Sequence, residues 1–260
     1  MSIARVTVLI TALSVTGAAP APPPFVVTYL RALGFVSSDR PGGVAGGSSL
    51  VTPSVLRLAQ EELGLSPTGV LDAVTLDMFS QQRCGVSPTW LAAPSPPGRT
   101  RRFALMGSRW RPAVLTYKVS VYSLTVPKAT VDRTLSTVLD HFSSSTKLKF
   151  AAAVPGDTEW NLDIRFTGDD HGCSSVFDAT VLAHAFPPEF GGDLHVRDAV
   201  DFNTTSLTYV LGHELAHSLG VHHSNRADAL MYPVYRDVDP LSPLLSGDDL
   251  RALQLLYGQA

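Results

Sequence analysis

Three histidines near residue 220 have the spacing of ligands for a single metal ion. His213 and His217 are four residues apart, so on a helix their imidazoles lie one above the other and both can reach one cation. Gly220 can adopt the left-handed backbone conformation that ends such a helix, and the turn then lets His223 supply a third nitrogen. Three protein ligands leave the fourth position of a zinc ion open for water, which is typical of catalytic zinc sites.

Glu214 follows the first of these histidines directly and projects toward the open position. A carboxylate there can take a proton from zinc-bound water, which makes hydroxide available near neutral pH. The alternative is an amphipathic helix that carries histidines by coincidence. With this composition, the five specified residues would arise together by chance in about one of 100,000 such sequences. The segment therefore predicts a hydrolytic metal site.

The same segment resembles a known family. The pattern HExxHxxGxxH is the metzincin signature, and Ser224 after the last histidine is typical of the matrix metalloproteinases. Residues 229–233 resemble the Met-turn of that family, which places Met231 beneath the metal, a role that a core methionine can also fill. The resemblance covers nearly the whole chain. It implies a zinc endopeptidase with an α+β fold, in which a twisted mixed sheet with three helices is preceded by a small helical prodomain.

The resemblance also implies how a substrate would bind. An extended peptide of an extracellular protein would pair with an edge strand over residues 181–186. Tyr209 stands at the position that controls pocket depth in the family, which implies a shallow pocket for side chains of leucine size. The alternative is a tyrosine that is simply packed in the core. The residues implied in substrate binding are Leu182, Ala183, Tyr209, Pro233 and Tyr235.

Residues 83–86 resemble the cysteine switch, in which the thiolate of Cys84 fills the open zinc position and prevents hydrolysis. Two residues that flank the switch in the family, a preceding proline and a following Pro-Asp pair, are Gln82 and Ser87-Pro88 here. We therefore expect Arg83 to lack its usual carboxylate partner and the switch to be looser. A disulfide between Cys84 and Cys173 is the alternative, and it would pre-empt the switch.

A second, structural zinc site and a calcium site are also implied by the resemblance. Three histidines match ligands of the family's second zinc, and a cysteine stands where the fourth ligand, an aspartate, is expected; the four residues are His171, Cys173, His184 and His195. A thiolate is a good zinc ligand. Asp178 is the best surviving calcium ligand of a shortened loop, and Arg197 stands where the family has a calcium-binding aspartate. Surface histidines and a solvated acidic loop are the alternative.

The N-terminal third of the chain has the features of a secreted precursor. Arg5 precedes a short apolar stretch and then small residues, which predicts a signal peptide over 1–19. Residues 87–102 are rich in proline and end in a basic cluster, where Arg99, Arg101 and Arg102 match the site of furin-type processing proteases; a basic surface loop is the alternative. We expect a prodomain over 20–102 and a catalytic domain over 103–260 that begins at Phe103, whose ammonium would pair with an aspartate of the last helix.

The periodicity of apolar residues predicts the elements that position these sites. Strands are predicted over 114–122, 148–154, 162–166 and 181–186. Helical spacing predicts a helix over 131–142 that covers the sheet, helices around residue 30 and after Pro53, and a last helix capped by Ser246 and Asp249.

Charge and hydropathy limit the partners. The formal net charge of −3 argues against a nucleic-acid binder, and the absence of a long apolar segment after the first 19 residues argues against a membrane anchor. Residues 1–102 carry eight Lys+Arg and five Asp+Glu while the rest carries twelve and eighteen, so the two parts can attract each other, unless these charges are simply solvated. The resemblance implies a monomer of the minimal, matrilysin-like form without the C-terminal propeller, inhibited by protein inhibitors of metalloproteinases. A secreted, non-proteolytic zinc-binding module that keeps its prodomain is the alternative function.

Overall fold

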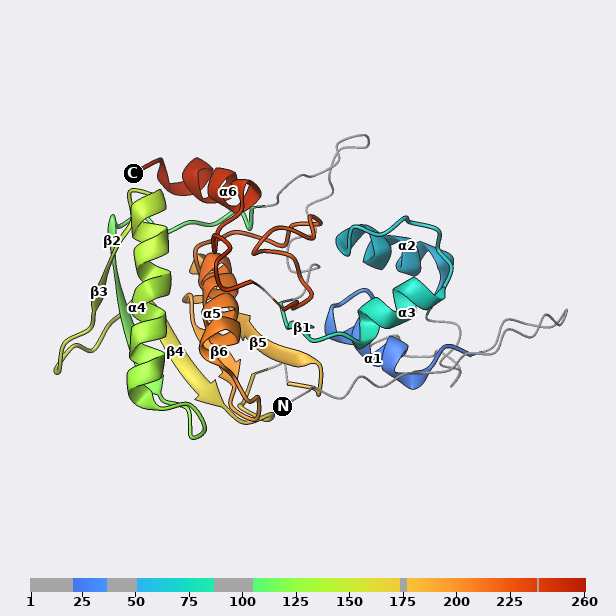
Figure 1. Ribbon diagram of the computed structural model, residues 1–260, viewed down its shortest axis with the longest axis horizontal. Helices are drawn as coiled ribbons and strands as arrows, with labels where there is room; N and C mark the ends of the chain where they lie inside the picture. Colours follow the sequence, from blue (N-terminus) through green and yellow to red (C-terminus); the bar gives the residue numbers. More distant parts are fainter. Residues whose placement is uncertain (1–20, 37–50, 87–104, 174–176, 238) are drawn as a thin grey trace, which may run out of the picture.

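A computed structural model of the chain describes residues 21–36, 51–86, 105–173, 177–237 and 239–260. Figure 1 shows two parts side by side: a small group of helices, α1 to α3, and a larger part in which helices cover a sheet. The expected signal peptide and the expected processing site lie outside the described residues. None of the helices in the described ranges is both long and apolar enough to cross a lipid bilayer.

The small part consists of α1 (Pro24–Ala32), α2 (Pro53–Glu62) and α3 (Ala73–Ser80). Proline suits the start of α1 and α2 because the N–H that it lacks has no partner in the first helical turn. Sequence periodicity missed α3, which begins where the carboxylate of Asp72 accepts a hydrogen bond from Thr75 N at 2.8 Å. Tyr232 and Val234 of the larger part join the apolar core of these helices, so the two parts share a hydrophobic contact.

The larger part is built on a six-stranded mixed sheet with the order β1-β5-β6-β4-β2-β3. All neighbouring strands are parallel except β5 and β6, which are antiparallel. The strands are β1 (Arg83–Cys84), β2 (Val114–Val121), β3 (Lys149–Ala152), β4 (Leu162–Thr167), β5 (Val181–Ala185) and β6 (Leu194–Arg197). Four of them match the predicted strands, whereas β6 and the two-residue strand β1 were not predicted.

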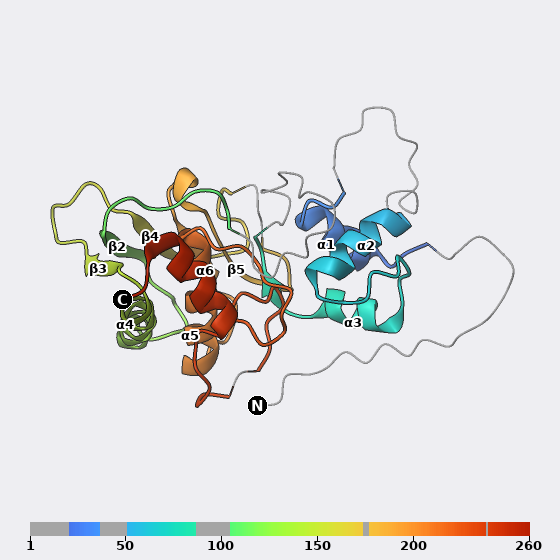
Figure 2. The same ribbon diagram turned by 90° about the horizontal axis from the view of Figure 1, so that it is seen from above.

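Helices α4 (Lys128–Ser145) and α5 (Thr204–Ser218) lie side by side over the sheet, and α6 (Gly247–Tyr257) closes one end of this layer (Figures 1 and 2). The predicted apolar positions of α4, from Val131 to Phe142, are buried against the sheet in the main core. These three helices and the mixed sheet confirm the α+β fold.

Local residues determine where α6 begins and where α5 ends. A capping box between Ser246 and Asp249 starts α6, as predicted. The chain leaves α5 through Gly220, which has a φ of +92°. A Cβ atom at this position would lie 2.3 Å from the carbonyl oxygen of Ser108, so only glycine allows this turn.

Candidate metal centres

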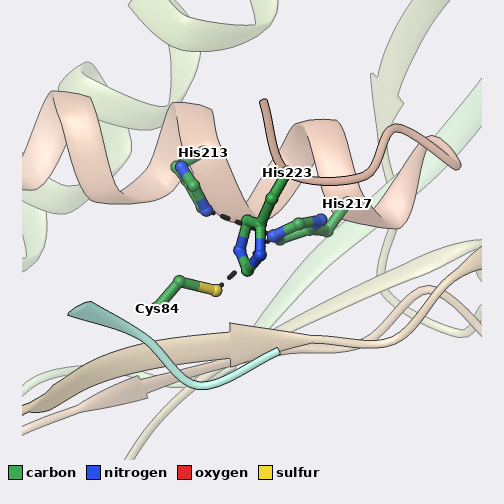
Figure 3. A group of neighbouring side chains, drawn as sticks. All are labelled: Cys84, His213, His217 and His223. Carbon is green, nitrogen blue, oxygen red and sulfur yellow. Dashed lines mark hydrogen bonds between the residues drawn. The ribbon is translucent and has the colours of Figure 1, made fainter. Parts of the chain in front are cut away.

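Helix α5 and the turn after it bring the three predicted histidines of the first site together. The Nε2 atoms of His213 and His217 lie 3.1 Å apart. His223 reaches the same point from the segment after Gly220, and all three side chains are buried. Figure 3 shows these rings pointing toward a common centre, with Cys84 approaching from the opposite side.

The second nitrogen of each ring has an acceptor. His213 Nδ1 lies 2.7 Å from the carbonyl oxygen of Leu230, and His217 Nδ1 lies 2.8 Å from that of Val221. Since a carbonyl only accepts, each Nδ1 must donate, and each neutral ring therefore directs an unprotonated Nε2 at the centre. Such lone pairs repel one another unless a cation lies between them, so the donor set fits a metal ion.

The spacing of the four donor atoms agrees with tetrahedral zinc. Zn–N and Zn–S bonds of roughly 2.0 and 2.3 Å would separate two nitrogens by about 3.3 Å and a nitrogen and a sulfur by about 3.5 Å. Cys84 Sγ lies 3.5 Å from His217 Nε2, and the ligand atoms of Cys84 and the three histidines all lie within 4.8 Å of one another. Burial lowers the pKa of His213 to about 4, and it also lowers the pKa values of His217 and His223 well below the ordinary range. The rings are therefore neutral near pH 7, as metal binding requires.

Cys84 is held at the centre by backbone hydrogen bonds on both sides of its strand. Arg83 N and Gly85 N donate to carbonyls of the β5 region, those of Thr180 and Ala183, each at 2.8 Å. On the other side, Cys84 N donates to Pro233 O at 2.9 Å. Burial raises the pKa of the Cys84 thiol, but coordination to a metal deprotonates a thiol outright. Cys84 and Cys173 are both free, so the alternative disulfide between them is not formed.

Glu214 lies beside this cluster in a buried position. Its Oε2 atom has no hydrogen-bond partner among the described residues, and burial raises the pKa of its carboxyl to about 8. A pocket lies next to it and is lined by four of the five residues implied in substrate binding: Leu182, Tyr209, Pro233 and Tyr235. The fifth, Ala183, pairs with Cys84 in the sheet.

Tyr209 is packed in the core and also lines the pocket. Its hydroxyl donates to Leu230 O at 3.0 Å, and its ring stands edge-on to Tyr235 with 5.5 Å between the centroids. The side chain is therefore fixed in the core while one face forms part of the pocket wall.

The second predicted cluster also assembles. His184 Nε2 lies 3.0 Å from His171 Nε2 and 3.1 Å from His195 Nδ1, and Cys173 Sγ lies 3.2 Å from the same His195 atom. Burial, together with the neighbouring histidines, lowers the pKa of His184 to about 3 and that of His195 to about 4. The donors of this cluster are three imidazoles and one thiol, a set that suits zinc.

The larger part of the chain also matches a known protein family. The family model described as Matrixin matches residues 109–258. The chain belongs to the matrixin family. The predicted resemblance is thereby confirmed, and membership implies zinc as the metal.

Curated relatives extend the similarity beyond this region. The matrixin chain is 37% identical to stromelysin-1 of Mus musculus over 220 residues, which are 81% of this chain and 44% of that protein. It is 34% identical to matrix metalloproteinase-18 of Xenopus laevis over 236 residues, 87% of this chain and 48% of that one. It is 36% identical to macrophage metalloelastase of Rattus norvegicus over 211 residues, 78% and 43% of the two chains. This matrixin spans about half the length of the curated relatives it matches.

The expectation that Arg83 lacks a carboxylate partner is wrong. Its Nη2 lies 3.2 Å from Asp178 Oδ2, and the Arg83 side chain is 1% exposed. The other oxygen of Asp178 accepts hydrogen bonds from Thr180 and from Val181 N. Burial would raise the pKa of Asp178, but these hydrogen bonds and the Arg83 charge lower it overall. In this matrixin, the partner of the switch arginine comes from a loop 95 residues farther along the chain.

The expected calcium ligand is thus engaged elsewhere. No group of three or more close metal-binding side chains in the described ranges includes Asp178. Arg197, at the other position of interest, forms an ion pair with Asp169 in which Nε and Oδ1 are 2.6 Å apart. Calcium binding by Asp178 stays a prediction, and it would compete with Arg83 for the same carboxylate.

The Met-turn is held by the last helix. Met231 is buried, and the backbone N–H groups of Leu230 and Met231 donate to the carboxylate of Asp249 at 2.8 and 3.1 Å. Asp248 accepts from the hydroxyl of Ser224 at 2.8 Å. Phe103, expected to pair with one of these aspartates, lies outside the described residues.

Sequence reasoning missed one residue at the first centre. Glu62, the last residue of α2, places Oε1 3.0 Å from His223 Nδ1. In the sequence it is the second of two adjacent glutamates at the polar end of an amphipathic helix, so nothing distinguishes it from a solvated side chain.

Proposed function

We propose that this matrixin is a secreted, zinc-dependent endopeptidase made as a latent precursor, which hydrolyses peptide bonds in extended segments of extracellular proteins. One observation carries the proposal. Three buried, neutral imidazoles direct unprotonated nitrogens at one point, and the unpartnered carboxyl oxygen of Glu214 lies beside it, next to a pocket and to β5.

His213, His217 and His223 would hold the catalytic zinc. The bound ion would polarise the substrate carbonyl and lower the pKa of a water molecule. Glu214 would accept a proton from that water and pass it to the leaving amine.

The substrate would bind as an added strand on β5, where backbone groups of residues 180–183 now bind the switch segment. Pro233 and Tyr235 would line the pocket for one substrate side chain, and Tyr209 would limit its depth. Protein inhibitors of metalloproteinases would reach the same site.

Cys84 would keep the precursor latent, because its sulfur lies where the fourth ligand of the zinc belongs. A furin-type protease cutting after Arg102 would release residues 20–102 and with them the thiol. The second cluster would hold a structural zinc through His171, Cys173, His184 and His195, since all four tetrahedral positions are then filled by the protein.

The test is the variant Glu214→Ala, compared with Glu159→Ala, which removes an exposed glutamate of the same domain. After treatment with a furin-type protease, we expect both variants to retain two zinc ions per chain by elemental analysis. Cleavage of a fluorogenic peptide should fall by at least about 100-fold in Glu214→Ala only, the range for loss of a general base. Full activity of Glu214→Ala would refute the assigned base. Zinc retention without peptide cleavage by the processed wild type would support the non-proteolytic binding module instead.

A further inference from the structure

The C-terminal turn of α2 contacts the segment that carries the third histidine. Tyr232 donates a buried hydrogen bond from its hydroxyl to the carbonyl of Leu63 at 2.9 Å. Gly64, with a φ of +64°, passes so close to Asn225 that a Cβ atom would lie 2.3 Å from its carbonyl oxygen. Both contacts fix the end of α2 against residues 222–232, and they bring Glu62 to the edge of the first metal centre.

Glu62 provides the outer partner of one metal-facing ring. His213 and His217 each donate to a backbone carbonyl of the catalytic part itself. His223 instead donates to a carboxylate oxygen of Glu62, 161 residues away in sequence. A carboxylate is the stronger acceptor, because the hydrogen bond is charge-assisted and raises the basicity of the ring toward a metal.

The surroundings of this contact favour a strong interaction. The side chain of His223 is 1% exposed and that of Glu62 is 21% exposed, so water has little access to the hydrogen bond.

Glu62, His222 and His223 can also be read as a third metal-binding group, because their ligand atoms lie close together. However, 3.0 Å between Glu62 Oε1 and His223 Nδ1 is a normal hydrogen-bond length. The other nitrogen of His223, Nε2, has no hydrogen-bond partner among the described residues and faces the first cluster. The geometry therefore matches a carboxylate–histidine–metal arrangement rather than a further ion.

We propose that Glu62 is a positioning residue for His223, through which the prodomain stabilises the metal centre that it blocks. The prodomain then contacts two of the four zinc positions at once: Cys84 fills one directly, and Glu62 orients the ligand of another. This inference rests on the proposed function of the chain as a zinc endopeptidase precursor. It follows that the precursor holds its catalytic zinc more tightly than the processed chain, which has lost Glu62.

The experiment compares four zinc-loaded precursors: wild type, Glu62→Ala, Glu62→Gln and the matched control Glu61→Gln, which neutralises the exposed neighbour of Glu62 on the same helix. Two rates are measured, alkylation of Cys84 by iodoacetamide, followed by peptide mass spectrometry, and transfer of zinc to a chelating dye. We expect both rates to rise about tenfold in Glu62→Ala, the lower end of the range for loss of an outer-sphere partner. Glu62→Gln, which keeps a neutral acceptor, should show a smaller rise, and Glu61→Gln should match wild type.

Processing provides an internal control, because all four precursors yield the same polypeptide after residues 1–102 are removed. Their zinc-transfer rates must then coincide. Wild-type rates in both Glu62 variants, or an equal increase in Glu61→Gln, would overturn the positioning role. If Glu62→Ala does not fold, as judged by circular dichroism, Glu62→Gln decides alone. Lack of peptide cleavage by the processed chains would contradict the proposed function, whereas active processed chains with unchanged precursor rates would contradict only the role of Glu62.

Discussion

The two candidate metal centres have the same donors, three histidines and one cysteine, but they obtain the cysteine differently. In the first centre, Cys84 comes from β1, more than a hundred residues before the histidines, on a segment that processing would remove. In the second centre, Cys173 lies two residues after its nearest ligand, His171. The same set of ligands would therefore include a removable thiol in the first centre and a permanent thiol in the second.

The two centres also differ in the hydrogen-bond partners of the histidine nitrogens that point away from the metal position. The rings of the first centre donate to Leu230, Val221 and Glu62, whereas His184 Nδ1 and His195 Nε2 of the second have no partner among the described residues. Oriented ligands suit a site that must keep its shape when its fourth ligand leaves. A site with four permanent ligands depends less on such support.

Replacing each cysteine separately tests most directly whether the two thiols have different functions. Cys84→Ala should raise the peptidase activity of the unprocessed precursor on the order of 100-fold, because a metal–thiolate contact worth several kcal/mol is lost. Cys173→Ala should leave the precursor latent. The measurement is cleavage of a fluorogenic peptide by precursors whose intact length is verified by mass spectrometry. Latency in Cys84→Ala would show that the thiol is not the block.

The second centre is tested by stability instead. Cys173→Ala should release one zinc from the processed chain and lower its melting temperature by about 5 to 10 °C, if about 2.7 kcal/mol of ligand stabilisation is lost. Cys173→Asp, which supplies a carboxylate oxygen at the same position, should retain the zinc and most of the stability. Calorimetry with elemental analysis measures both. An unchanged melting temperature in Cys173→Ala would argue against a structural ion there.

Asp178→Asn tests how much the ion pair between Arg83 and Asp178 contributes to holding Cys84 at the first centre. Loss of the ion pair leaves the buried Arg83 guanidinium without its carboxylate, and since Asp178 is 32% exposed we expect a moderate effect. Alkylation of Cys84 in the precursor should accelerate by about 5- to 10-fold, with no change at Cys173. Asp140→Asn, an exposed aspartate of α4, is the control. Equal alkylation rates in the two variants would mean that the ion pair does not hold the switch.

The smallest effect is expected from Asp72→Ala, which removes the N-cap of α3. Such caps contribute about 1 kcal/mol, so Cys84 alkylation should rise by at most about fivefold while the second centre is unaffected. Hydrogen bonds from Thr75 lower the pKa of Asp72 below its ordinary 3.8, so its contribution is present above pH 3.8 and is lost as the pH falls through the lowered value. Thermal unfolding of the precursor between pH 5 and pH 2 should show this loss in the wild type and not in Asp72→Ala. Asp77→Ala on the same helix serves as the control.

The features that could be predicted from the sequence are formed by residues that are close together in the chain. Residues four apart on a helix must share a face, so the pairing of His213 with His217 and the turn at Gly220 could be read directly. The capping box of Ser246 and Asp249 and the long amphipathic helix α4 are local in the same way. Family resemblance supplied the members of the second cluster, which spacing alone does not bring together.

Contacts between distant segments could not be predicted. Arg83 meets Asp178 and Glu62 meets His223 only because the helical part docks on the larger part, and no periodic pattern encodes that docking. The family pattern places the switch carboxylate in a position occupied by Pro88, which led to the wrong expectation of an unpaired Arg83. Strand β1 was missed because its two residues cannot show an alternating pattern.

The hydrogen bonds between β1 and β5 have a consequence for the processed protein in solution. While they exist, the carbonyls of Thr180 and Ala183 accept hydrogen bonds from the switch segment, and β5 is not an edge strand. Removal of β1 leaves a bare row of main-chain groups, which is a template for self-association as well as for binding other chains. We therefore expect concentrated processed protein to inhibit itself by dimerising through β5, and the onset of activity to coincide with the onset of a tendency to aggregate.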